Sequence, residues 1–309
     1  MSHVFGPVPS RRLGLSLGVD LVPRKTCTFD CLYCQVGRTT RKIIEPGSLV
    51  PIEPVIDELR KSLETVSPDA VTFSGSGEPT LHSGIGRIME AVRKMTETKI
   101  ALLTNGSLLW KKDIREGILS ADTIMPTLSS ANEETFRTIH RPHPDLGLQL
   151  IITGLHALRK EFKGEFALEV ILLAGLNDSD REIEGLKEVI DGLSPDRIQL
   201  NTVARPPADA GALPLDMPRL EKIKSFLGER SEIIADVSFA KGHDRRYRLA
   251  ADVLEMALRR PVRAEDVART QGIRAQEAES ILEGLVHKGR LSRENHGGDV
   301  FYVSSSLKA

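Results

Sequence analysis

Short apolar runs alternate with longer amphipathic segments through the middle of the chain. The apolar runs are rich in β-branched residues and lie at residues 70–73, 100–103, 123–125, 166–173 and 197–203. The amphipathic segments have apolar residues at helical spacing and include residues 85–95, 151–162 and 180–190. Alternating strands and helices are typical of βαβ units. The sequence therefore predicts an α/β protein with a parallel sheet, either a barrel or an open doubly wound sheet.

Two further segments extend this pattern. Residues 15–22 predict an earlier strand, because apolar residues alternate with smaller or polar ones from Leu15 to Leu21. Residues 233–237 are a candidate for a later strand. At least six strands are thus expected before the alternation ends.

The pattern changes near residue 245. Three segments with helical spacing are followed by two strands around a glycine pair, at residues 249–258, 264–270, 275–287 and 291–303. Three short helices followed by a hairpin indicate a winged-helix module. We therefore expect two domains, residues 1–240 and residues 245–309.

Composition and charge narrow the class of protein. Of the 309 residues 40% are hydrophobic, enough to bury a core, and the formal net charge is −1. So small a charge gives no global field that would attract nucleic acid or an anionic membrane. The apolar runs are too short to span a bilayer, and the first residues do not form a signal peptide. We expect a cytoplasmic protein with no membrane partner.

The three cysteines of the chain, Cys27, Cys31 and Cys34, fall within eight residues. An odd number so closely spaced is a poor disulfide framework and favours metal binding or redox chemistry. In a C-x3-C-x2-C loop, each thiolate can bind a different iron of a cubane, which leaves the fourth iron without a protein ligand. Reactive metal sites keep such an open position.

Structural zinc is the alternative, with His3, His82 or His140 as the fourth ligand. It is less favoured, because structural zinc sites usually consist of two separated cysteine pairs.

Polar motifs follow successive predicted strands. They occupy residues 74–80, 104–106, 129–130 and 175–178, and the strand at 197–203 leads into residues 205–207. In parallel α/β folds, ligands bind where the strands end at their carboxyl side. The motifs are therefore expected to contribute to one shared site.

The cysteine spacing, with an aromatic residue before Cys34, resembles the signature of the radical S-adenosylmethionine (SAM) superfamily. The resemblance covers roughly residues 13–237 and implies a partial (β/α)6 barrel with a [4Fe–4S] cluster and SAM as cofactors. It implies that the amino and carboxylate groups of SAM chelate the open iron. Electron transfer then gives a 5′-deoxyadenosyl radical, with ferredoxin or flavodoxin as the low-potential electron donor. Tyr33 is implied to lie near the adenine.

Two more motifs are similar to this superfamily. Gly77-Glu78-Pro79 resembles its GGEP element, with Gly75 and Gly77 allowing close approach of the backbone. Glu78 or nearby backbone carbonyls would accept hydrogen bonds from the methionine ammonium group. Asn105 belongs to a TNG turn that the superfamily shares. Either motif alone is also typical of an ordinary surface turn.

Ser129 and Asn177 stand where the superfamily often contacts the ribose or the methionine carboxylate. Their alternative roles are caps, Ser129 for a helix beginning near Asn132 and Asn177 for one after Asp180.

Residues 5–20, 136–142 and 175–178 resemble a branch of Fe–S oxidoreductases related to the tRNA wyosine-modifying radical enzymes. Those enzymes carry extra cysteines for a second cluster, and this chain has no further cysteine. Their reaction is therefore not transferred, and the substrate, RNA or protein among the candidates, stays unidentified. No catalytic residue is assigned.

Substrate contacts are predicted at the barrel mouth, where arginine can bind phosphate or carboxylate through two hydrogen bonds. The candidates are Asn201, Arg205, Arg141 and His143. Equally, the Arg–Pro sequences at 141–142 and 205–206 would only stiffen loops. The pair Arg11-Arg12 is either a phosphate contact or a solvated pair.

Charge in the last segment argues against nucleic-acid binding. The expected recognition helix carries Glu277, Glu279 and Glu283, and from residue 249 onward nine basic residues balance nine acidic ones. Docking of protein or substrate is therefore favoured over DNA. The rival function is a regulator that senses redox state at the Fe–S site and binds nucleic acid through the winged helix.

Overall fold

The computed structural model of the chain describes residues 2–10, 12–234, 249–287 and 289–304. Its strands are β1 (Val4–Ser10), β2 (Gly14–Val19), β3 (Thr26–Cys27), β4 (Arg41–Lys42), β5 (Ala70–Phe73), β6 (Lys99–Thr104), β7 (Thr123–Pro126), β8 (Glu165–Leu172), β9 (Arg197–Thr202), β10 (Ser231–Ile233), β11 (Leu291–His296) and β12 (Asp299–Ser304). Its α-helices are α1 (Ile52–Thr65), α2 (Ile85–Met95), α3 (Lys112–Ile118), α4 (Glu133–His140), α5 (Leu148–Glu161), α6 (Asp180–Leu193), α7 (Met217–Leu227), α8 (Leu249–Arg259), α9 (Ala264–Gln271) and α10 (Ala275–His287).

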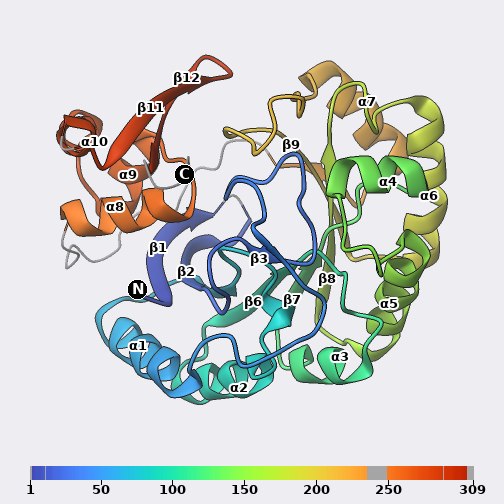
Figure 1. Cartoon of the computed structure of the whole chain (residues 1–309), viewed down its shortest axis with the longest axis horizontal. Helices are drawn as coiled ribbons and strands as arrows, with labels where there is room; N and C mark the ends of the chain where they lie inside the picture. Colours follow the sequence, from blue (N-terminus) through green and yellow to red (C-terminus); the bar gives the residue numbers. More distant parts are fainter. Residues whose placement is uncertain (1, 11, 235–248, 288, 305–309) are drawn as a thin grey trace.

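An eight-stranded sheet organises the molecule, in the order β1-β2-β5-β6-β7-β8-β9-β10. All neighbours pair in parallel except β1 and β2, which are antiparallel. The sheet is curved, and α1, α2, α3, α5 and α6 follow one another along its outer side (Figure 1). The fold is therefore α/β with a mostly parallel sheet, and its strands confirm the six that the hydrophobic pattern predicts.

Strand β1 has no counterpart in the sequence prediction. It contains Pro7 and Pro9, which lack the N–H that a strand in the middle of a sheet needs, so proline confines a strand to an edge. β1 is such an edge strand, because it pairs with β2 alone in this sheet. The predicted strand at 233–237 is only partly seen. β10 ends at Ile233, and residues 235–237 lie outside the described residues.

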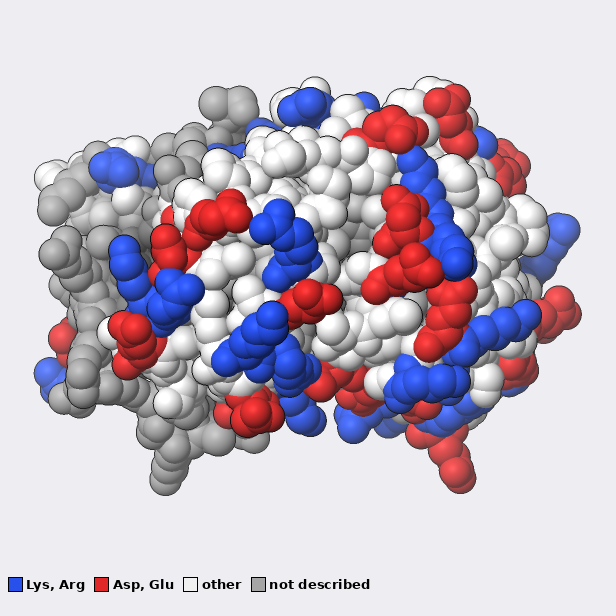
Figure 2. Space-filling view, turned by 90° about the horizontal axis from the view of Figure 1, so that it is seen from below, with Lys and Arg blue, Asp and Glu red and all other residues white. Residues whose placement is uncertain are grey.

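The outer helices bury one apolar stripe each against the sheet. In α2 the buried residues are Ile85, Ile88, Met89 and Val92, at the three- and four-residue spacing that places them on one side. None of the helices in the described ranges is long and apolar enough to cross a membrane. Figure 2 shows the surface from the side of α1–α3, where basic and acidic side chains are interspersed without a continuous area of one sign. This agrees with the near-zero net charge.

The last elements follow the predicted order of three helices and a hairpin. Helices α8, α9 and α10 and strands β11 and β12 lie beside β1 (Figure 1). Gly297 and Gly298, both at positive φ, connect the two strands. Met256, Val267 and Leu282 share a buried apolar cluster with Val8 of β1. The last segment is therefore packed on the sheet edge. Assignment as a winged helix stays a prediction, and the expected domain boundary at 240–245 falls outside the described residues.

Candidate active site

The cysteine loop is held at both of its ends. At its base, β3 pairs with β4, so Thr26 lies opposite Arg41 and Cys27 opposite Lys42. Inside the loop, Asp30 accepts a hydrogen bond from the backbone N–H of Thr39 at 2.8 Å. Backbone bonds also join the loop to the end of α4, from Asp30 N–H to the His140 carbonyl and from Leu32 N–H to the Ile139 carbonyl, both at 2.9 Å. These bonds fix the backbone that carries the thiols.

The three thiols share one half-buried region. Burial, and next the negative charge of Glu78, raise the pKa of Cys27 to about 12. Burial and the neighbouring thiols Cys27 and Cys34 raise the pKa of Cys31, and burial raises that of Cys34. Three thiolates therefore cannot coexist here without positive charge nearby, which bound iron ions provide. The three sulfur donors are soft ligands, lie close together and require positive charge to ionise, and they therefore fit an iron–sulfur cluster.

The zinc alternative has little structural support. In the described part of the chain, no group of three His, Cys, Asp or Glu side chains could hold a single metal ion. His82 is occupied at both ring nitrogens, since Nε2 lies 2.9 Å from the Val50 carbonyl and Nδ1 accepts from the Gly84 N–H. A cubane cluster does not require three ligands around one metal ion, because each thiolate binds a different iron.

His140 and Tyr33 lie against the middle cysteine. His140 Nδ1 is 3.4 Å from Cys31 Sγ and 3.2 Å from the Tyr33 hydroxyl. The imidazole is buried against Phe29 and Phe136. Burial lowers the pKa of His140 to about 3, so the ring is neutral at neutral pH. Tyr33 is thus adjacent to the thiols, while its predicted contact with adenine stays a prediction.

Glu78 joins the loops that follow β5 and β6. Its side chain is 2% exposed, and Oε1 accepts from the Thr80 N–H, the Thr80 hydroxyl and the Thr104 hydroxyl at 2.6–3.0 Å. Oε2 accepts from the Asn105 N–H at 2.8 Å. Burial raises the pKa of Glu78, although these hydrogen bonds oppose the shift. Four bonds from the chain leave this carboxylate little free capacity.

Gly75 and Gly77 allow two close approaches. Gly75 has φ +142°, and a Cβ there would lie 2.5 Å from Cγ of Asp20. A Cβ on Gly77 would lie 1.7 Å from the backbone oxygen of Thr26, the residue before Cys27. Only glycine therefore fits where the loop after β5 meets the base of the cysteine loop.

Asn105 completes the connection between the loops. Its Nδ2 donates to the Thr28 hydroxyl at 2.7 Å and lies 3.5 Å from Cys27 Sγ. Its Oδ1 accepts from the Ser107 N–H at 3.0 Å. The predicted residues Gly75, Gly77, Glu78 and Asn105 are thus brought together with Cys27.

Ser129 and Asn177 form one buried network. Asn177 Nδ2 donates to the Ser129 and Ile171 carbonyls, and its Oδ1 accepts from the Leu173 N–H. Ser129 Oγ accepts from the Ile171 N–H at 3.0 Å. These bonds join the ends of β7 and β8. The capping alternative is wrong for both, because other residues cap the helices, Asn132 for α4 and Ser179 for α6.

Two of the predicted substrate contacts are held by other side chains. Arg205 is buried and bonds to the Pro261 carbonyl and to Asp266 in the last segment. Burial lowers the pKa of Arg205 to about 9. Arg141 pairs with Asp209 at 2.8 Å. Arg205 therefore connects the loop after β9 to the last segment and does not present its guanidinium at the barrel mouth.

The other two candidates have local partners. Asn201 donates to Glu169 at 3.2 Å, and His143 Nδ1 accepts from the Asp145 N–H at 3.3 Å. Arg12 is not part of a solvated pair, since it is largely buried and pairs with Glu169 at 2.8 Å. Arg11 lies outside the described residues.

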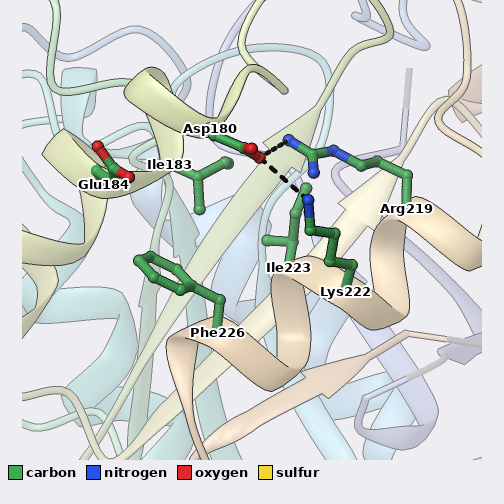
Figure 3. Close-up of a pocket in the computed structure, with 7 residues that line it drawn as sticks. All are labelled: Asp180, Ile183, Glu184, Arg219, Lys222, Ile223 and Phe226. Atoms are coloured by element: carbon green, nitrogen blue, oxygen red, sulfur yellow. Dashed lines mark ion pairs between the residues drawn. The ribbon is translucent and has the colours of Figure 1, made fainter.

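A cavity of about 600 Å³ opens beside Cys34. Its walls come from three segments distant in sequence: the cysteine loop, residues 206–208 after β9, and the last segment with Pro261, Glu294 and Val303. A second, smaller groove of about 160 Å³ lies between α6 and α7 (Figure 3). There Asp180 pairs with Arg219 and Lys222 above Ile183, Ile223 and Phe226. Only the first cavity adjoins a predicted metal ligand.

Two residues at this site were not assigned to it from the sequence. The sequence indicates His140 only as an alternative zinc ligand and gives Asp20 no individual role at the site. Both lie in stretches, 136–142 and 5–20, whose resemblance to the Fe–S oxidoreductase branch was the available signal. Asp20 accepts from the Ser76 N–H and hydroxyl, and so supports the loop that contains both glycines.

Comparison with solved structures places the fold. TYW1 with a lysine-pyruvate adduct bound superposes with a TM-score of 0.55 at 20% identity, over 74% of this chain and 76% of that one. SuiB of Streptococcus suis, bound to S-adenosylmethionine, gives a TM-score of 0.52 at 17% identity, over 70% and 47%. At such identities the likeness shows the fold alone.

Sequence comparison also identifies the family. A UPF0026 protein of Methanocaldococcus jannaschii is 34% identical over 99% of this chain and 97% of its own length. A protein named GTPase Obg of Brachyspira hyodysenteriae is 33% identical over 97% of this chain, which spans only 45% of that relative. The Radical SAM superfamily profile matches residues 21–186. Enzymes of this superfamily use a [4Fe–4S] cluster and S-adenosylmethionine as cofactors. The chain belongs to the radical SAM superfamily.

Proposed function

We propose that the protein is a radical SAM enzyme in which Cys27, Cys31 and Cys34 bind three irons of one [4Fe–4S] cluster. SAM binds at the carboxyl ends of the strands, and hydrogen is abstracted from a substrate that stays unidentified, with RNA and protein among the candidates. The observation that carries this proposal is the meeting of the three thiols with the Glu78–Asn105 network in one half-buried region. When bound, the reduced cluster supplies the electron that splits SAM into methionine and a 5′-deoxyadenosyl radical.

The thiols release their protons when iron is loaded. Their raised pKa values favour the neutral form when no metal is bound, so the positive charge of a metal would be needed to hold them as thiolates. His140 then orients the middle ligand and stabilises it through a hydrogen bond. A neutral imidazole with its proton on Nδ1 donates to Cys31 Sγ, 3.4 Å away.

Glu78 acts as a support for the SAM site. Because its carboxylate already accepts four hydrogen bonds from Thr80, Thr104 and Asn105, we assign the methionine ammonium group to backbone carbonyls of residues 75–77. Gly75 and Gly77 place no side chain of their own beside these carbonyls. Ser129 and Asn177 hold the ends of β7 and β8 where the ribose and the methionine carboxylate are expected.

Electrons come from a low-potential ferredoxin or flavodoxin, and the last segment docks the substrate. The cavity beside Cys34 supports this second role, because Pro261, Glu294 and Val303 form part of its wall. The nucleic-acid regulator is less supported. Arg293, one of the basic residues of the hairpin, is paired with Glu283.

The test uses anaerobically purified, cluster-reconstituted protein with dithionite and SAM, and mass spectrometry detects 5′-deoxyadenosine. The wild type is expected to form it, whereas Cys27→Ala, Cys31→Ala and Cys34→Ala are expected to form none and to retain less iron. Arg293→Gln, which changes a surface pair of the same protein, serves as the control and should behave like the wild type. Cleavage of SAM by all three cysteine variants would refute the proposal.

A further inference from the structure

A buried ion pair connects the last segment, residues 249–304, to residues 74–77 after β5, the loop at which we propose that SAM binds (the SAM loop). Arg259, the final residue of α8, donates through Nη1 to Asp20, which follows β2. The side chains are 9% and 3% exposed. The same Nη1 lies 3.3 Å from the Ser76 hydroxyl. One guanidinium therefore contacts both a buried carboxylate and the loop after β5, from more than 180 residues further along the chain.

Asp20 forms the support on which that loop is built. Its Oδ2 accepts from the Ser76 N–H at 3.1 Å and from the Ser76 hydroxyl at 2.5 Å. The carboxylate also lies so close to Gly75 that a Cβ there would be 2.5 Å from Asp20 Cγ. The position of Asp20 therefore determines the path of residues 74–77, which lead directly into Glu78.

A carboxylate this deeply buried needs a cation close by. Removing one partner of a buried pair leaves an uncompensated charge, and the surrounding backbone must then move or the carboxyl group must be protonated. Either response changes the hydrogen bonds that Asp20 accepts from Ser76. The SAM loop is thus sensitive to a residue outside the parallel sheet.

Arg259 is itself held in place by Ser2 and by Phe5 of strand β1. Its Nη2 donates to the Ser2 carbonyl at 2.5 Å, and its guanidinium lies 5.1 Å from the centre of the Phe5 ring. Helices α8 and α9 pack against β1 through the cluster that contains Val8. The guanidinium is therefore positioned only when the last segment is seated on the sheet edge.

We propose that Arg259 is a positioning residue for SAM binding. Acting through Asp20, it fixes residues 74–77 in the conformation that accepts the methionine end of SAM, so the last segment is part of the SAM site and not an independent appendage. This inference rests on the proposed function, because it assumes that SAM binds at this loop.

The variants Arg259→Met, Arg259→Lys, Asp20→Asn and the double variant Asp20→Asn/Arg259→Met test it. The Kd of radiolabelled SAM is measured by equilibrium dialysis on reconstituted protein, with iron content determined in parallel. Arg259→Met is expected to raise the Kd about 10-fold or more without loss of iron, as is typical when a supporting hydrogen bond is removed. Arg259→Lys, which keeps the charge, should lie between it and the wild type.

The double variant distinguishes positioning from general damage. Asn still accepts from Ser76 and carries no charge, so the double variant should bind SAM more tightly than Arg259→Met alone. The matched control is Arg293→Gln, which breaks another arginine–carboxylate pair of the last segment away from the loop, and it should bind SAM like the wild type.

Hydrogen exchange provides a readout that does not need SAM. In Arg259→Met the amide of Ser76 should exchange faster than in the wild type, while the amides of β8 should not change. Unchanged exchange and unchanged Kd in Arg259→Met, or equal losses in Arg293→Gln, would overturn the inference. If the wild type with a full cluster binds no SAM but exchange responds as expected, the proposed function fails and the Arg259–Asp20–loop connection stands.

Discussion

The two ends of the parallel strands differ in how their polar groups are balanced. At the carboxyl ends, Cys27, Cys31 and Glu78 are sheltered acids whose pKa values are all raised by burial. At the amino ends, a cavity of about 330 Å³ is lined by residues of both signs, and Arg197 pairs with Glu165 at 2.8 Å. At the carboxyl ends the thiols keep raised pKa values, whereas at the amino ends acidic and basic side chains pair with each other.

This difference indicates that metal binding takes place at the carboxyl ends of the strands. Thiols whose pKa is raised by burial become useful when a cation arrives, and iron ions are the cations that soft thiolates prefer. Pairs that are already matched contribute to stability and leave nothing for a ligand to neutralise. The same division between a reactive and a stabilising end is general in parallel α/β barrels.

The strongest test of this contrast is to break the buried pair inside the sheet. Arg12→Met leaves Glu169, which also accepts from Thr127 and Asn201, without its cation. Such a change is expected to lower the free energy of unfolding by about 3–5 kcal/mol. Urea denaturation measures it, and Arg12→Met/Glu169→Gln should recover part of the loss. A folded Arg12→Met protein that cannot bind SAM would show that this pair belongs to the reactive end.

The second test removes the carboxylate at the carboxyl ends. Glu78→Ala deprives Thr80, Thr104 and Asn105 of their shared acceptor, so the loops after β5 and β6 lose their connection. The Kd of SAM is expected to rise about 100-fold. Glu165→Ala, the same deletion at the amino ends, should leave the Kd unchanged. Equal effects of the two variants in equilibrium dialysis would contradict the contrast.

Much of the fold could be predicted because the parallel strands are buried and locally distinctive. Runs such as residues 70–73 appear as β5 with the same bounds, and the helix predicted at 85–95 is α2. Strand β1 could not be predicted from local pattern, because Pro7 and Pro9 argue against a strand until its position at the sheet edge is known.

The residues of the site likewise divide into those that local sequence indicates and those that only the fold brings together. The cysteine spacing and the glycines at 75 and 77 are local features, so sequence alone indicated the region. Partners distant in sequence could not be inferred. Arg205 was expected at the barrel mouth, but Asp266, 61 residues later, holds it in a buried pair. Which side chain meets Arg205 is decided by packing of the last segment, and no local pattern encodes that.

A smaller effect is expected from the neutral ring beside Cys31. His140→Phe keeps an aromatic ring against Phe29 and Phe136 but removes Nδ1, which lies 3.4 Å from Cys31 Sγ and, in the tautomer we propose, donates to it. Fewer hydrogen bonds to cluster sulfurs disfavour the more negative reduced form, so the midpoint potential should fall. SAM cleavage should slow about 10-fold.

A redox titration followed by electron paramagnetic resonance measures this potential. His82→Gln is the control, since His82 is also buried and bonds to the Val50 carbonyl and the Gly84 N–H rather than to a thiol. A potential that is unchanged in His140→Phe would remove His140 from the reactive end.

The smallest effect is expected where the charges are exposed and matched. Arg197→Gln breaks the pair with Glu165, whose side chains are 57% and 36% exposed. Solvent screens such a pair, so the free energy of unfolding should change by about 0–1 kcal/mol and less at high salt. Urea denaturation at two salt concentrations measures it, and 5′-deoxyadenosine formation should match the wild type. If this variant instead loses SAM cleavage while remaining folded, the amino ends take part in the reaction, and the contrast between the two ends of the sheet is wrong.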